Sequence, residues 1–156
     1  MSAFPVYPPS PARARVYVLY EGFARSHYAT YVSASNTSTT LTTYTLPLSD
    51  PYYGIGGIYI PKTALGLTKL YAIVNYYMFT ASGGVSRLKA TIGTNSVTIE
   101  EVVSPPSASI SRDSRFVDLS SILADGVLYI QADLAGDGTN ASSAYLSHTI
   151  IFGVSE

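Results

Sequence analysis

The stretch LYAIVNYYMFTASGGVSRLKATIGTN, residues 70–95, decides the fold class. Residues 70–79 are rich in aromatic and β-branched side chains, and both faces of a strand there would be largely apolar. That pattern is typical of a strand in the middle of a sheet. Residues 82–84, Ser-Gly-Gly, then predict a turn. In residues 86–92 apolar and polar side chains alternate, which indicates a second strand with one buried face.

The same period of two recurs along the chain, between clusters of Gly, Pro, Asn and Ser. It predicts further strands at 15–20, 28–33, 37–46, 57–60, 97–103, 127–134 and 144–154, with a weaker candidate at 109–117. One short helical turn is expected at 118–123, with Asp118 as its N-cap. Because no helices alternate with the strands, we expect an all-β fold. An antiparallel β-sandwich of the single jelly-roll type is the first choice, and an immunoglobulin-like sandwich is the second.

The N-terminal segment, residues 1–14, has a different character. Its prolines fix the backbone near polyproline II and remove hydrogen-bond donors, so we expect an extended arm there and one β-sandwich domain over residues 15–156. A stiff arm with apolar side chains loses little entropy on docking. We therefore predict that it contacts a neighbouring copy, although docking on its own domain or a disordered leader are alternatives. The predicted contact residues are Phe4, Pro5, Val6, Tyr7, Pro8 and Pro9.

The composition favours association over catalysis. The chain has 156 residues, nine Lys and Arg, ten Asp and Glu, a net charge of −1, and fourteen Tyr. A surface so poor in charge promotes self-association, and tyrosine suits partly wet contact surfaces as well as strands. Arg13 and Arg15 form the only close basic pair near the arm, which is no strong signal for nucleic acid. No apolar run reaches the ~18 residues of a membrane helix, and we expect no signal peptide because no apolar stretch precedes the first charges.

The residues that usually carry catalysis are few. There is no cysteine, and His27 and His148 lie far apart without a metal-binding spacing. Glu100 and Glu101 are adjacent, so on a strand they point to opposite faces and cannot form a paired-carboxylate site. We interpret both as edge or surface charges that block unwanted strand pairing. His148 is expected to be structural, on the same strand face as Leu146, Ile150 and Phe152.

One stretch, DLAGDGTNAS, could bind a cation. Asp133, Asp137 and Asn140 supply the hard oxygen atoms that Ca²⁺ prefers, although the spacing is not that of an EF-hand. The same residues are the ordinary residues of a turn between two strands, which is the alternative. Calcium is the only cofactor that the sequence suggests.

These features predict a non-enzymatic, self-assembling structural subunit whose copies are linked through the N-terminal arm. It would be a virion coat or decoration protein, or the repeating unit of an extracellular filament or tube, and would lie in the virion or at the cell surface. The alternative is a carbohydrate-binding or adhesin-type sandwich. Its candidate stacking rings are Tyr28, Tyr31, Tyr52, Tyr53, Tyr76 and Tyr77. A metal-dependent jelly-roll hydrolase is a third possibility, but the chain lacks a full set of ligand residues.

Overall fold

The computed structural model describes residues 13–23, 32–48 and 56–156. The predicted contact residues of the arm lie outside the described residues, as do His27, Tyr28, Tyr31, Tyr52 and Tyr53. The strands are β1 (Arg15–Phe23), β2 (Val32–Asn36), β3 (Thr42–Leu46), β4 (Ile58–Ile60), β5 (Leu67–Thr80), β6 (Val85–Ile92), β7 (Asn95–Val103), β8 (Ser109–Asp118), β9 (Gly126–Ala135) and β10 (Ser142–Ser155). Two short helical segments join them, α1 (Lys62–Leu65) and the 3-10 turn Ser120–Ile122.

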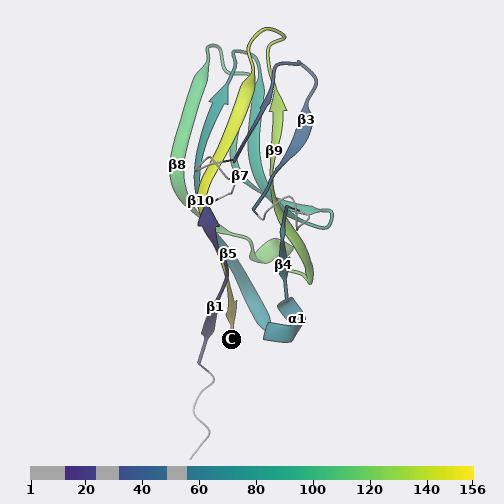
Figure 1. The fold of residues 1–156 in the computed structure, drawn as a ribbon, viewed down its shortest axis with the longest axis vertical. Helices are drawn as coiled ribbons and strands as arrows, with labels where there is room; N and C mark the ends of the chain where they lie inside the picture. The colour runs from purple at the N-terminus through teal and green to yellow at the C-terminus, as the bar shows by residue number, and fades with distance from the viewer. Residues whose placement is uncertain (1–12, 24–31, 49–55) are drawn as a thin grey trace, which may run out of the picture.

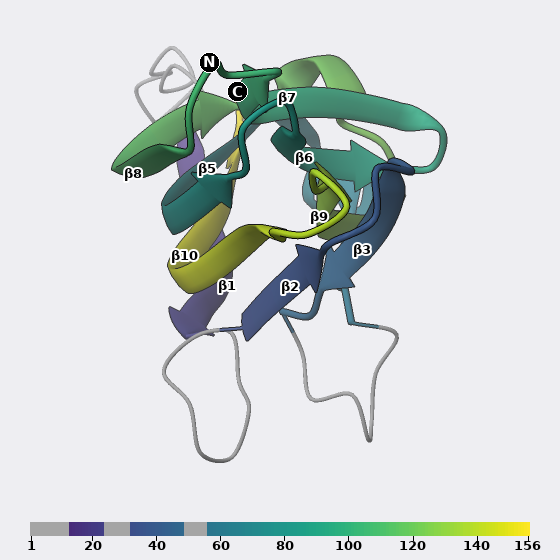
Figure 2. The ribbon, with the colours of Figure 1, turned by 90° about the horizontal axis from the view of Figure 1, so that it is seen from above.

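The strands form two antiparallel sheets that face each other (Figures 1 and 2). In the first sheet the order is β1-β10-β5-β8, and β2 continues along β10 beyond β1. In the second sheet the order is β3-β9-β6-β7, and β4 pairs with another part of β9. The pairing is nested, because β1 pairs with β10, β3 with β9, β5 with β8 and β6 with β7. This nested order is that of a jelly roll and confirms the predicted antiparallel sandwich.

The core lies between the sheets. Along β5, buried residues alternate with half-buried ones, so Leu70, Val74 and Met78 face the other sheet. Leu88 of β6 and Leu128 of β9 are among the fully buried residues that oppose them. Burial of one such leucine contributes about 1.5–3 kcal/mol relative to exposure. The central position predicted for the strand at 70–79 is confirmed, since β5 lies between β10 and β8.

The limits of some elements differ from the prediction. β3 begins at Thr42 and not at residue 37, because the Asn36 side chain turns the chain. The Asn36 Oδ1 accepts a hydrogen bond from the Ser38 N–H at 3.0 Å. The Asn36 Nδ2 donates to the Thr40 carbonyl at 2.9 Å and to the Leu134 carbonyl at 2.7 Å. Such local side-chain bonds compete with strand pairing. The helix α1 was not predicted.

Two further details concern the connections. The helical turn expected at 118–123 is a single 3-10 turn, Ser120–Ile122. Its N-cap is Leu119 and not Asp118 as predicted. The Asp118 carboxylate accepts a hydrogen bond from the Ser120 N–H at 2.9 Å. Gly57 allows a close approach of strands, because a Cβ there would lie 2.5 Å from Val127 Cγ1.

No helix in the described part of the chain has the length and apolar character needed to cross a membrane.

Candidate functional site

The outer face of the first sheet carries large apolar side chains that are exposed among the described residues. Val16 and Val18 of β1 are 63% and 62% exposed, and Ile110 and Phe116 of β8 are 60% and 58% exposed. We use the name aromatic face for a set of outward apolar and aromatic side chains of this sheet. It consists of Val16, Val18, Tyr71, Ile73, Phe79, Ile110, Phe116, Ile150, Phe152 and Val154.

Three rings form the centre of the aromatic face. The Tyr71 ring lies 5.1 Å from that of Phe116 and 5.5 Å from that of Phe152, centroid to centroid. The Phe116 and Phe152 rings are 6.2 Å apart. These separations are typical of interacting aromatic pairs. The rings come from β5, β8 and β10, so the cluster joins three neighbouring strands.

Strand register extends this cluster to the edge of the sheet. Phe152 lies opposite Tyr71 on one side and Val18 on the other, and the next outward pair is Val154 and Val16. Outward charged residues flank this cluster in the register, where Asp118 lies opposite Tyr71, Lys69 opposite Val154 and Glu21 opposite Ile150. An apolar, aromatic centre with a polar rim is the usual anatomy of a protein–protein interface.

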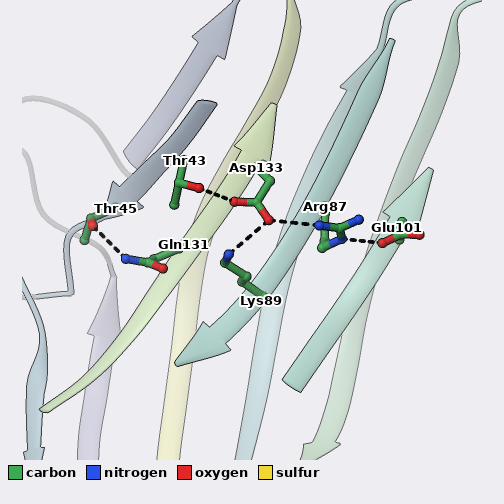
Figure 3. Close-up of polar contacts among 7 residues, drawn as sticks. All are labelled: Thr43, Thr45, Arg87, Lys89, Glu101, Gln131 and Asp133. Carbon is green, nitrogen blue, oxygen red and sulfur yellow. Dashed lines mark hydrogen bonds and ion pairs between the residues drawn. The ribbon is translucent and has the colours of Figure 1, made fainter. Parts of the chain in front are cut away.

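The outer face of the second sheet is polar where a network of side chains crosses four of its five strands, β3, β9, β6 and β7 (Figure 3). Asp133 of β9 is at its centre. Its carboxylate accepts a hydrogen bond from the Thr43 hydroxyl at 2.5 Å, and lies 3.1 Å from Arg87 Nη1 and 3.0 Å from Lys89 Nζ. Arg87 also pairs with Glu101 on β7. The two outer faces therefore differ in chemistry.

The partners of Asp133 determine its charge. Burial is the largest single influence and acts to raise the pKa of this carboxyl. The hydrogen bonds from Thr43, Lys89 and Arg87 together outweigh burial, so the pKa lies below its ordinary value. Asp133 is therefore a charged residue held by two cations and a hydroxyl group.

The other predicted calcium ligands lie in the loop after β9. The Asp137 carboxylate accepts hydrogen bonds from the N–H groups of Thr139 and Asn140 and from the Asn140 side chain. These bonds lower the pKa of Asp137, and the hydrogen bond from the Asn140 N–H has the largest effect. Asp133 and Asp137 accept hydrogen bonds from different partners. Within the described ranges, no group of three or more His, Asp or Glu side chains could hold a metal ion, and calcium stays a prediction.

Glu100 and Glu101 point to opposite faces of β7, as predicted, and β7 is an edge strand. The interpretation of Glu100 as a surface charge is wrong. Its carboxylate accepts a hydrogen bond from the Tyr76 hydroxyl at 2.6 Å and lies 2.7 Å from Arg115 Nη2, both on the first sheet. The pKa of Tyr76 is raised to about 12. Burial of the ring is the largest cause, and the hydrogen bond to Glu100 is the second. Glu100 thus joins the two sheets.

A bulge in β10 changes the predicted place of His148. Leu146 lies opposite Tyr76 and Thr149 lies opposite Val74, so two residues of β10 occupy the place of one. Leu146 is buried in the core, whereas Ile150 and Phe152 lie on the aromatic face. The prediction that His148 shares a face with all three is therefore wrong. Its Nε2 lies 3.8 Å from Glu21 Oε1.

A hollow of about 520 Å³ lies beside this bulge. We call it the tyrosine hollow. The rings of Tyr77 and Tyr145 are 5.4 Å apart there and inclined by 70°, and the Arg112 guanidinium lies 5.6 Å from the centre of the Tyr77 ring. Its lining residues are Asn75, Tyr76, Tyr77, Arg112, Asp113, Tyr145 and Ser147. Tyr76 and Tyr77 were among the rings proposed for sugar stacking, and Tyr76 is instead buried at 4% exposure.

The aromatic face was not predicted as a site, and of the tyrosine hollow only Tyr76 and Tyr77 were predicted, as sugar-stacking rings. The apolar character of both faces at 70–79 was the available signal, and it was interpreted as the mark of a central strand. The sequence does not show which strands flank β5, and therefore cannot bring Phe116 and Phe152 beside Tyr71.

The chain was compared with known proteins. No sequence profile of a protein family matches it, and neither does any curated protein. Among solved structures it is similar to one titled for the infectious bursal disease virus Gt strain, with a TM-score of 0.42, 12% identity, and coverage of 96% of this chain and 36% of the other. It is similar to T=1 particles derived from infectious bursal virus, with a TM-score of 0.44, 12% identity and coverage of 96% and 36%. It is also similar to the PRD1 vertex protein P5, with a TM-score of 0.36, 14% identity and coverage of 89% and 99%. The chain spans little more than a third of the length of the two bursal virus chains.

Proposed function

We propose that this protein is a non-enzymatic structural subunit that assembles with other copies of itself, as a coat or decoration protein of a virion. The exposed aromatic face is the observation that carries the proposal. Monomeric soluble proteins rarely expose large contiguous apolar patches, and such patches mark interaction sites. Here the patch extends over four adjacent strands and contains a three-ring cluster.

The fold and the composition support the same proposal. Jelly rolls are a common architecture of viral capsid domains, and also of lectins and cupins. With a net charge of −1, copies of the chain repel one another weakly. A repeating unit of an extracellular filament or tube would use the same face. The form of the assembly, a shell or a filament, distinguishes a virion protein from such a repeating unit.

The non-enzymatic part of the proposal is supported by the way in which carboxylates are used. Asp133 is held by Thr43, Arg87 and Lys89, and Glu100 by Tyr76 and Arg115. Both carboxylates serve to join strands. The N-terminal arm forms the second contact in the proposal, through Phe4, Val6 and Tyr7 on a neighbouring copy.

Sedimentation velocity over a concentration series tests the proposal. The wild-type chain should form oligomers whose population rises with concentration. A double variant, Val18→Lys with Phe116→Lys, should weaken association about 30-fold or more, because each unpaired charge buried in an apolar contact costs about 1 kcal/mol or more.

The other outer face provides matched controls. Val103 on β7 is 53% exposed and Tyr59 on β4 is 60% exposed, so Val103→Lys with Tyr59→Lys adds the same two charges elsewhere. This control should assemble as the wild type does. Equal association of the two double variants, with circular dichroism showing that both are folded, would contradict the proposal.

A further inference from the structure

We propose that the tyrosine hollow is the acceptor for the proline-rich arm of a neighbouring copy. This inference rests on the proposed function and adds to it the place where the arm binds. Two features carry it. One is the chemistry of the hollow, and the other is the distance that an arm can reach.

The hollow has the chemistry of a polyproline-binding surface. Tyr77 and Tyr145 stand at 70° to each other, so two aromatic surfaces meet in it. Grooves lined by aromatic rings recognise proline-rich segments in the polyproline II conformation. That conformation makes no internal hydrogen bonds, so its carbonyl groups need donors. The side chains of Asn75 and Arg112, both in the lining, can supply them.

The arm has the matching sequence. Residues 5–8, Pro-Val-Tyr-Pro, and residues 8–11, Pro-Pro-Ser-Pro, are two overlapping PxxP motifs. This is the spacing that aromatic-lined grooves bind. Residues 4–11 in polyproline II would span about 25 Å at ~3.1 Å per residue. Tyr77 and Tyr71 are six residues apart on β5, or about 20 Å. An arm of that length can therefore cover both the hollow and the three-ring cluster.

The reach of the chain assigns the arm to another copy. Ser155 pairs with both Arg15 and Leu67, so the start of β1 lies level with the start of β5 (Figure 1). Asn75, the nearest residue of β5 in the lining, is eight residues further along β5, or about 26 Å away. Seven residues separate Arg15 from Pro8, which allows at most about 25 Å even at full extension. The motif at residues 8–11 therefore cannot reach the hollow of its own copy, and the motif at residues 5–8 cannot lie wholly in it.

Cysteine cross-linking between two populations of the full chain tests this assignment. The chain contains no cysteine, so each introduced thiol is unique. One population carries Ser10→Cys in the arm and the other carries Ser147→Cys in the hollow. Under mild oxidation, the mixed disulfide should form at least roughly tenfold faster than with a partner carrying Thr98→Cys, because docking raises the local thiol concentration. Thr98 is exposed on β7 of the other sheet.

A second variant tests the role of the rings. Adding Tyr77→Ala to the Ser147→Cys chain should reduce the cross-linking rate to that of the Thr98→Cys control. If wild-type protein assembles in sedimentation but Ser147→Cys and Thr98→Cys cross-link equally fast, this inference is overturned while the proposed function stands. Binding of a glycan to the wild type but not to Tyr77→Ala, with no preferential cross-link, would instead assign the hollow to a sugar. If the wild type is a monomer at every concentration, the proposed function fails as well.

Discussion

At the scale of single residues, charged side chains of this protein connect strands. Alternation along β7 was enough to predict that Glu100 and Glu101 point to opposite faces. The contacts of Glu100 could not be predicted, because its partners Arg115 and Tyr76 belong to strands of the other sheet. Likewise, the acidic residues of the predicted calcium stretch gave no sign that Asp133 faces Arg87 and Lys89 from a neighbouring strand.

The first residue-scale prediction concerns Asp133. Asp133→Asn should lower the free energy of unfolding by about 1–3 kcal/mol at neutral pH, because Arg87 and Lys89 lose the carboxylate between them. Urea denaturation measures this. Glu101→Gln is the control, since it removes a more exposed partner of Arg87 and should cost at most about 1 kcal/mol.

The pKa of Asp133 gives this prediction a pH dependence. Because the folded-state pKa is lowered, the stabilisation is present above the unfolded pKa of about 3.9 and is lost as the pH falls through the folded value. The difference between wild type and Asp133→Asn should therefore shrink below about pH 4. A difference that stays constant down to the acid transition would contradict this assignment.

The second residue-scale prediction concerns Tyr76. Its pKa is raised to about 12 in the folded protein, against about 10 in an unfolded chain. Between these values the folded state holds a proton that the unfolded state has lost, so stability should fall as the pH rises from about 10 to 12. Tyr76→Phe should flatten this decline in urea titrations at a series of alkaline pH values. An unchanged slope in Tyr76→Phe would show that other groups cause it.

At the scale of elements, the period of two predicted nearly every strand within the described residues, and the irregularities were missed. The bulge in β10 has no sequence signature, and it moved His148 out of the predicted alternation. β8 was only a weak candidate, because its apolar side chains are few; its pairing with β5 stabilises it. Local pattern thus predicts which segments form strands, and the neighbouring strand decides their limits.

The prediction at this scale concerns the approach of β4 to β9. Gly57→Ala should destabilise the fold by about 1–3 kcal/mol, because its Cβ would lie 2.7 Å from the Leu128 carbonyl oxygen as well as against Val127. Gly22→Ala is the control. There the nearest atom is the end of the Tyr20 side chain at 3.1 Å, which can shift. Equal thermal midpoints for the two variants would contradict this account of the close contact.

At the scale of the whole molecule, the sandwich class was predictable, and a jelly roll was the first choice. The nested strand order was not, because it depends on contacts between the two ends of the chain. The aromatic face is a product of that order, since it combines side chains from β1, β10, β5 and β8. A surface made from four distant segments has no signature in any one of them.

The prediction at this scale concerns the arm. Deletion of residues 1–11 should leave a folded monomer, because the deletion removes the apolar residues of the proposed arm contact and no described strand begins before Arg15. Circular dichroism would measure the fold and sedimentation the size. Assembly that persists in the shortened chain would refute the linking role of the arm.

The central claim is that this sandwich is built to pack against copies of itself. Electron microscopy of the purified full chain at high concentration tests it most directly. The account predicts regular particles, shells or tubes of repeating subunits, which disappear in the Val18→Lys, Phe116→Lys variant. A field of uniform single subunits at every concentration would contradict it.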